Sequence, residues 1–86
     1  MEITYSAKAQ EDIQFWKRSG DLKAMSRISA LLDDIEQHPF SGIGKPEALK
    51  YKLAGCWSRR ITKEHRLVYR VATDEIEIVS MRFHYQ

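Results

Sequence analysis

Residues 57–71 read WSRRITKEHRLVYRV and predict two β-strands joined by a short polar turn. Apolar residues alternate with polar residues on both sides of the turn, as expected of strands with one face against a core. The alternation predicts strands at residues 57–62 and 67–72, with residues 63–65 as the turn. Basic residues interrupt the pattern repeatedly, and they are Arg59, Arg60, Lys63, Arg66 and Arg70.

The arginines of this hairpin indicate a surface that binds phosphate groups. A guanidinium group is planar and permanently charged, and it can donate two parallel hydrogen bonds to one phosphate. A single Arg or Lys on an exposed sheet face is more often a solvated residue that protects the sheet from edge pairing. The prediction therefore depends on the cluster, in which Arg59, Arg60 and Arg66 lie on neighbouring strands.

The charge of the chain is divided unequally between its halves. Residues 1–44 carry five Lys/Arg and seven Asp/Glu, whereas residues 45–86 carry nine Lys/Arg and five Asp/Glu. The net charges of the halves are thus −2 and +4, although the whole chain has a net charge of only +2. A local positive field attracts a polyanion even when the total charge is small. Nucleic acid is the ligand that this asymmetry favours.

The N-terminal half predicts a short strand followed by two helices. Residues 2–5 alternate as a strand does, and residues 7–18 and 22–37 place apolar side chains at helical spacing. Ser6 and Asp21 precede the two helical segments and are suitable N-caps. A Ser-Gly-Asp turn between the helices predicts a helical hairpin.

Two further strands complete the predicted sheet. Residues 49–53 alternate Leu, Tyr and Leu with lysines, and residues 75–83 carry apolar residues on both faces. The resulting order is β-α-α-β-β-β-β. It predicts an α+β fold in which two N-terminal helices pack on one face of a mainly antiparallel sheet. The uncovered face should be broad and rich in arginine, so an extended RNA strand could lie on it.

Length and composition predict a single domain over residues 1–86. No apolar run approaches the ~18 residues of a membrane span, and the N-terminus has no signal-peptide core, so we expect a cytoplasmic protein without membrane contact. Cys56 has no partner for a disulfide, and His38, His65 and His84 share no metal-ligand spacing. We expect no metal or other cofactor, and we expect His65 to be exposed and non-catalytic.

The second half also contains a candidate for each group that metal-free cleavage of RNA requires. Such a reaction needs a base for the 2′-hydroxyl proton, an acid for the leaving 5′-oxygen and cations for the phosphorane. Glu47 is a candidate base where a loop enters the sheet, while His84 and Tyr85 end the last strand. Antiparallel pairing of the last two strands would bring residues 82–84 level with Arg66. Glu47 alone is an ordinary loop acid, so the residues by themselves predict only an RNA or phosphate binder.

The run GKPEALKYKLAGCWSRRITKEHRLVYRV and the terminal FHY resemble the YoeB/Txe toxins of the RelE superfamily. The resemblance extends from the opening strand to Tyr85. It implies a small α+β endoribonuclease that binds the translating ribosome and cuts mRNA in the A site without a metal. It implies the general base at Glu47, the phosphate-stabilising cation at Arg66 and the general acid at His84, followed by the terminal tyrosine. The basic positions that support this site in the family fall on Lys50 and Arg60.

The same resemblance implies partners and leaves two other functions open. A type II toxin has a cognate antitoxin, here of the YefM/Axe kind, and it acts on the ribosome and mRNA; a homodimer is also compatible with the family. One alternative is an inhibitor that blocks its target without cutting it, as the related ParE-type toxins do with DNA gyrase. A structural or adaptor protein is the other. Cys56 stands where the family often has an aromatic residue, and Gln86 follows the usual terminal tyrosine.

Overall fold

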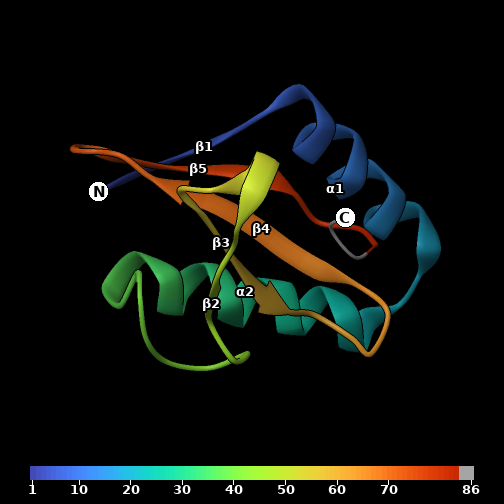
Figure 1. Ribbon diagram of the computed structural model, residues 1–86. Coiled ribbons are helices and arrows are strands. Elements are labelled where there is room, and N and C mark those ends of the chain that lie inside the picture. The colour runs from blue at the N-terminus through green and yellow to red at the C-terminus, as the bar shows by residue number, and fades with distance from the viewer. Residues whose placement is uncertain (84–86) are drawn as a thin grey trace.

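The structure, a computed structural model, describes residues 1–83 and contains two helices, five strands and one 3₁₀ turn (Figure 1). In chain order these are β1 (Glu2–Tyr5), α1 (Ala7–Ser19), α2 (Leu22–Gln37), β2 (Glu47–Ala48), the 3₁₀ turn η1 (Tyr51–Leu53), β3 (Cys56–Arg60), β4 (Arg66–Val71) and β5 (Glu75–Ser80). The strands form one sheet in the order β1-β5-β4-β3-β2. Only β1 pairs in parallel, with β5, so the predicted α+β fold and its mainly antiparallel sheet are confirmed.

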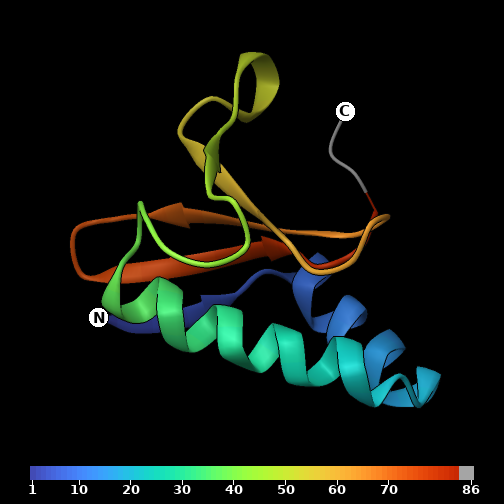
Figure 2. The same cartoon turned by 90° about the horizontal axis from the view of Figure 1, so that it is seen from below.

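Both helices lie on one face of the sheet, and η1 lies on the other side (Figure 2). The helices begin where the sequence predicts, because Ser6 Oγ accepts from the Ala9 amide at 3.0 Å and Asp21 Oδ1 accepts from the Ala24 amide at 2.9 Å. Such caps contribute about 1 kcal/mol each. None of the helices within residues 1–83 is sufficiently long and apolar to span a membrane.

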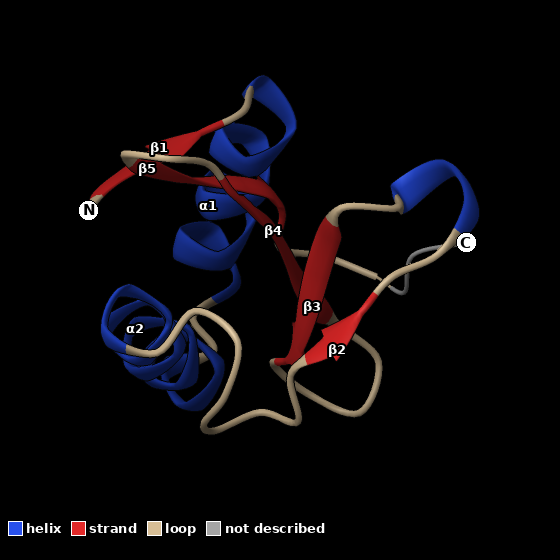
Figure 3. Cartoon of the chain, turned by 60° about the vertical axis from the view of Figure 1, so that its left-hand side comes forward, coloured by secondary structure: helices blue, strands red, loops and turns tan. Residues whose placement is uncertain are grey.

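The main core fills the space between the helices and the sheet. Leu31 and Ile35 of α2 meet Leu67 of β4 and Ile76 and Ile78 of β5, and none of these side chains has exposed area. On the opposite face, a smaller cluster forms beneath the segment that contains η1; its buried members are Leu49, Cys56 and Val68. The face without helices is therefore partly covered. β2 and β3 lie at the end of the sheet away from β1 (Figure 3).

The predicted strand at residues 49–53 is wrong. Only Glu47 and Ala48 pair with β3, and the chain then turns through η1. Tyr51 has a left-handed φ of 58°, which a strand cannot accommodate, and its side chain is 92% exposed. The alternation of Leu49 with Leu53 reflects their packing onto the smaller cluster rather than pairing in the sheet.

The last strand ends at Ser80, three residues before the predicted boundary at residue 83. Side chains of α1 take the backbone groups that a further ladder would need. Asp12 Oδ2 accepts from the Met81 amide at 2.8 Å, and Trp16 Nε1 donates to the Met81 carbonyl at 2.8 Å. The chain beyond Ser80 is therefore held by α1, which redirects it toward the start of β4.

Candidate active site

Strand register brings Glu47, Arg60 and Arg66 to the same face of the sheet. Glu47 lies opposite Ser58, and Arg60, two residues further along β3, lies opposite Arg66 of β4. Residues directly opposite one another point to the same face, and so do residues two apart along a strand. The shared face is the one away from the helices. The predicted general base, Glu47, therefore lies on the same face as two of the predicted cations, Arg60 and Arg66.

These three residues line one hollow of about 300 Å³, together with Gly44, Lys45, Pro46 and Ser58. Lys45 was not predicted as a site residue. Its φ of 53° is left-handed, and a conformation of this kind cannot be recognised from a single Lys in the sequence. The only available signal was its place in the GKPE run, two residues before Glu47.

Gly44 explains how this loop reaches the sheet. Its φ is 81°, and a Cβ at this position would lie 2.7 Å from a Leu31 methyl carbon and 3.2 Å from the Arg59 Cβ. Its carbonyl accepts from the Arg60 amide at 2.8 Å. The close approach needs glycine, and it sets the following residues, which include Lys45 and Glu47, over the open face.

Arg60 and Arg66 make the hollow strongly cationic. Like charges on directly opposite positions of two strands repel each other, and an anion between them removes that cost. Arg66 Nη1 also donates to the Thr62 carbonyl at 3.3 Å, which fixes the orientation of the guanidinium group. The arrangement is suited to a phosphate group, with the Glu47 carboxylate at the rim.

The end of the described chain lies against this site. The Arg66 amide donates to the Phe83 carbonyl at 3.1 Å, and the Phe83 amide donates to His65 Nδ1 at 2.7 Å. The predicted alignment of the chain end with Arg66 is therefore confirmed as far as Phe83. The other two predicted catalytic residues, His84 and Tyr85, lie outside the described residues.

Arg59 does not belong to this surface, and its prediction as a phosphate-binding residue is wrong. Its side chain has no exposed area and points into the helix-covered face. The guanidinium donates to Asp34 Oδ2 at 2.5 Å and to Tyr69 Oη at 3.1 Å, and it also donates to backbone carbonyls of the loop after α2, which are those of His38, Ser41 and Ile43. Arg59 therefore fixes this loop to α2 and to β4.

The alternation in the sequence contained the signal that Arg59 is buried. It occupies the same face of β3 as Trp57, which packs against the main core, and Ile61 continues that face beyond the strand. The pKa values of the two side chains that Arg59 binds, Asp34 and Tyr69, are also shifted. The Arg59 hydrogen bond, with that of the Ile43 amide, holds the pKa of Asp34 below its usual value, and burial raises the pKa of Tyr69.

Lys50 and His65 do not line the small hollow that contains Glu47 and Arg66. Lys50 is exposed, precedes η1 and lies outside the lining of the hollow. His65 is half-buried rather than exposed, so that prediction is wrong. Its ring contacts the Trp16 ring edge-on, with centroids 5.1 Å apart, and lies 5.3 Å from the Phe83 ring.

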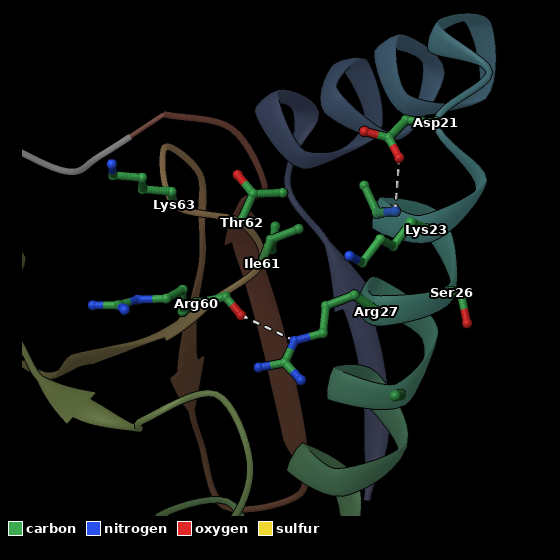
Figure 4. Close-up of a pocket in the computed structure, with 10 residues that line it drawn as sticks. Asp21, Lys23, Ser26, Arg27, Arg60, Ile61, Thr62 and Lys63 are labelled. Carbon is green, nitrogen blue, oxygen red and sulfur yellow. Dashed lines mark hydrogen bonds between the residues drawn. The ribbon is translucent and has the colours of Figure 1, made fainter.

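A larger hollow of about 670 Å³ lies between α2 and the end of β3 (Figure 4). Arg60 contributes to both hollows, and the further cations here are Lys23, Arg27 and Lys63. Arg27 Nε donates to the Arg60 carbonyl at 3.4 Å. Asp21, whose Oδ1 accepts from the Ala24 amide, is the one carboxylate among the described residues of a lining that has four cations, so positive charge dominates the groove. The charge of the larger hollow is suited to a polyanion. The smaller hollow also contains a candidate general base, Glu47.

The fold defines a class of small α+β proteins with two helices on one face of a five-stranded sheet, and here Glu47 and the cations Arg60 and Arg66 share a hollow on the other face. In residues 1–83, no group of three or more His, Cys, Asp or Glu side chains is placed to hold a metal ion. Residues 5–85 match the model of the YoeB-like toxin of bacterial type II toxin-antitoxin systems. The chain therefore belongs to the YoeB-like toxin family, as its sequence motifs predict.

Individual relatives support this membership over the full length. The chain is 48% identical over 83 residues to Toxin RelK of Mycobacterium tuberculosis, covering 96% of each protein. It is 44% identical to Toxin YoeB of Escherichia coli K12, covering 99% of this chain and 100% of that toxin. Among solved structures, a YoeB/ParE toxin from Agrobacterium tumefaciens has a TM-score of 0.93 at 42% identity, covering 99% and 100% of the two chains. A YoeB dimer from Staphylococcus aureus has a TM-score of 0.89 at 44% identity, covering 99% and 98%.

Proposed function

We propose that this protein is the toxin of a type II toxin–antitoxin pair and a metal-independent endoribonuclease that cleaves mRNA in the ribosomal A site, which inhibits translation. The observation that carries the proposal is the convergence of Glu47, Arg60 and Arg66 on one hollow. A protein that only blocks its target needs cations on this face, but it has no need for a carboxylate at their rim.

The reaction uses the RNA itself as nucleophile. Glu47 takes the proton from a 2′-hydroxyl, whose oxygen attacks the adjacent phosphorus while the bond to the 5′-oxygen breaks. Arg66, supported by Arg60, stabilises the negative charge of the phosphorane, and His84 donates a proton to the leaving oxygen. The products are a 2′,3′-cyclic phosphate and a 5′-hydroxyl. A general base and a general acid each contribute about 10²- to 10⁴-fold.

The proposed role of His84 is supported by its position in the chain. It directly follows Phe83, whose carbonyl accepts from the Arg66 amide. We also assign Tyr85 to the catalytic residues and Lys50 to the basic residues that support the site, as the family resemblance implies. RNA supplies the nucleophile, so no cofactor enters the mechanism.

The proposed partners are a YefM/Axe-like antitoxin, the ribosome and its mRNA. Two structures from Staphylococcus aureus, 44% and 43% identical to this chain, are YoeB–YefM complexes, and one of them is described as heterotetrameric. Another structure from the same organism is a YoeB dimer, which supports a homodimer here. We propose that the toxin acts in the cytoplasm, where ribosomes are found.

Mapping of mRNA ends separates this function from its alternatives. After brief induction of the toxin in a bacterial host, primer extension on an abundant mRNA should find new 5′ ends at defined places within codons. A toxin of the ParE kind would instead stop replication and leave the mRNA intact. An adaptor protein would do neither, and either outcome would contradict the proposal.

Arg66→Ala should lower the single-turnover cleavage rate by about 10²- to 10³-fold, because the phosphorane loses a charged donor aimed at it. The measurement is quench-flow cleavage of ribosome-bound mRNA at saturating toxin. Arg70→Ala is the matched control, since Arg70 lies on the same strand but lines neither hollow. Equal rates for the Arg66→Ala variant and the parent would remove this residue from the mechanism.

Ribosome binding should weaken as salt rises, because each phosphate contact releases counterions. Lys23 and Lys63 line the larger hollow, and replacing both by Ala should make the slope of log affinity against log salt shallower by about 2. The affinity of a Glu47→Gln toxin for ribosomes, measured by fluorescence between 50 and 200 mM salt (a range of about fourfold), provides the slope. An unchanged slope would show that this groove holds no phosphate.

A further inference from the structure

Phe83, the last described residue, has a backbone conformation that a bulky side chain rarely adopts. Its φ is 60°, in the left-handed region. Residues of this kind persist in that region only where their surroundings hold them, and they are concentrated at functional sites. The conformation of Phe83 determines the direction in which the chain leaves toward residue 84.

Both backbone groups of Phe83 are bound by one dipeptide. Its amide donates to His65 Nδ1 at 2.7 Å, and its carbonyl accepts from the Arg66 amide at 3.1 Å. Arg66 thus holds Phe83 with its backbone while its side chain lines the small hollow. The two contacts fix the end of the described chain relative to the cation of the proposed site.

The ring of His65 is itself held in place. Its centroid lies 5.1 Å from that of Trp16, at an interplanar angle of 84°, and Trp16 is anchored to the Met81 carbonyl by its indole nitrogen. The His65 amide donates to Thr62 Oγ1 at 3.1 Å, which fixes the backbone of the turn. Because Nδ1 accepts a hydrogen bond, the neutral ring carries its proton on Nε2.

We propose that His65 is a positioning residue, whose Nδ1 holds Phe83 in its left-handed conformation beside Arg66 and thereby supports the reaction proposed for the residue that follows, His84. The inference rests on the proposed function only for the role of His84 as general acid. The hydrogen bond from Phe83 to His65 stands without it. A displacement of about 1 Å at a reacting group can lower a rate by about 10²-fold, so a contact remote from the phosphate can matter this much.

Three substitutions separate the acceptor of His65 from its ring. His65→Phe keeps an aromatic ring but removes the acceptor. His65→Asn removes the ring but places Oδ1 close to the position of Nδ1, and His65→Gln places its acceptor near the position of Nε2 instead. We expect His65→Phe and His65→Gln to lower the single-turnover rate roughly 10- to 100-fold at unchanged ribosome affinity, and His65→Asn to recover most of the parent rate.

A second readout does not depend on cleavage. Amide hydrogen exchange of free toxin, followed by NMR, should be at least roughly tenfold slower at Phe83 in the parent and His65→Asn than in His65→Phe. Thermal unfolding of each variant reports whether it folds. Slow exchange at Phe83 in His65→Phe, or parent-like cleavage by that variant, would overturn the proposal. A parent that cleaves no RNA would refute the proposed function instead, and exchange at Phe83 would still decide whether His65 holds this backbone.

Discussion

Replacing Glu47 by Gln should reduce the single-turnover rate of mRNA cleavage by about 10²- to 10⁴-fold while ribosome affinity stays close to that of the parent. Glutamine has nearly the same size and can still form hydrogen bonds, but it cannot take the 2′-hydroxyl proton. Since Glu47 is exposed at the rim of the hollow, the substitution should also leave the unfolding temperature nearly unchanged. The rate is measured by quench-flow on programmed ribosomes.

Glu11→Gln is the matched control for this experiment. Glu11 is an exposed carboxylate on α1, which covers the opposite face of the sheet (Figure 2). Its replacement removes the same charge and should leave the cleavage rate as it is. Growth inhibition and cleavage by Glu47→Gln at the level of the parent would show that another group is the base.

The second large effect concerns stability rather than catalysis. Arg59→Met should lower the free energy of unfolding by at least about 3 kcal/mol, because the three loop carbonyls to which Arg59 donates lose that donor at once. For a chain of this size, a loss of that magnitude lowers the midpoint of thermal unfolding by roughly 12–25 °C. Circular dichroism during a thermal scan measures it.

Arg60→Met provides the comparison for Arg59→Met. The two residues are adjacent on β3, but Arg60 is exposed and its side chain lines the hollows. Its replacement should change the free energy of unfolding by no more than about 0.5 kcal/mol. Similar losses of stability for both variants would contradict the structural role assigned to Arg59, and a stable Arg59→Met toxin that no longer binds ribosomes would return this residue to the RNA-binding surface.

Local signals in the sequence were sufficient to predict the helices and the central hairpin. Ser6 and Asp21 cap the helices as side chains of their type do, and the alternation around the turn places β3 and β4 within one or two residues of their ends. The alternation in residues 49–53 predicts a strand that does not form, because alternation indicates only which side chains are buried. It does not distinguish a strand from a short segment that packs over a second cluster.

The site residues were predictable to different degrees. Glu47 and Arg66 could be recognised from their chemistry and from motifs, and the register brings them together. The charge of Arg59 predicts a phosphate contact, but its position on the buried face of β3 gives it a structural role instead. Lys45 depends on a left-handed backbone, and His65 depends on a contact with Phe83 eighteen residues away, so neither role is visible in a local pattern.

The central claim is that the small hollow holds one phosphate of an mRNA whose own 2′-hydroxyl is activated by Glu47. Mass spectrometry of the two fragments from ribosome-bound mRNA tests this claim most directly. The upstream fragment should end in a 2′,3′-cyclic phosphate and the downstream fragment should begin with a 5′-hydroxyl. A 3′-hydroxyl on the first fragment and a 5′-phosphate on the second would mean that water attacked the phosphate, which contradicts the proposed chemistry.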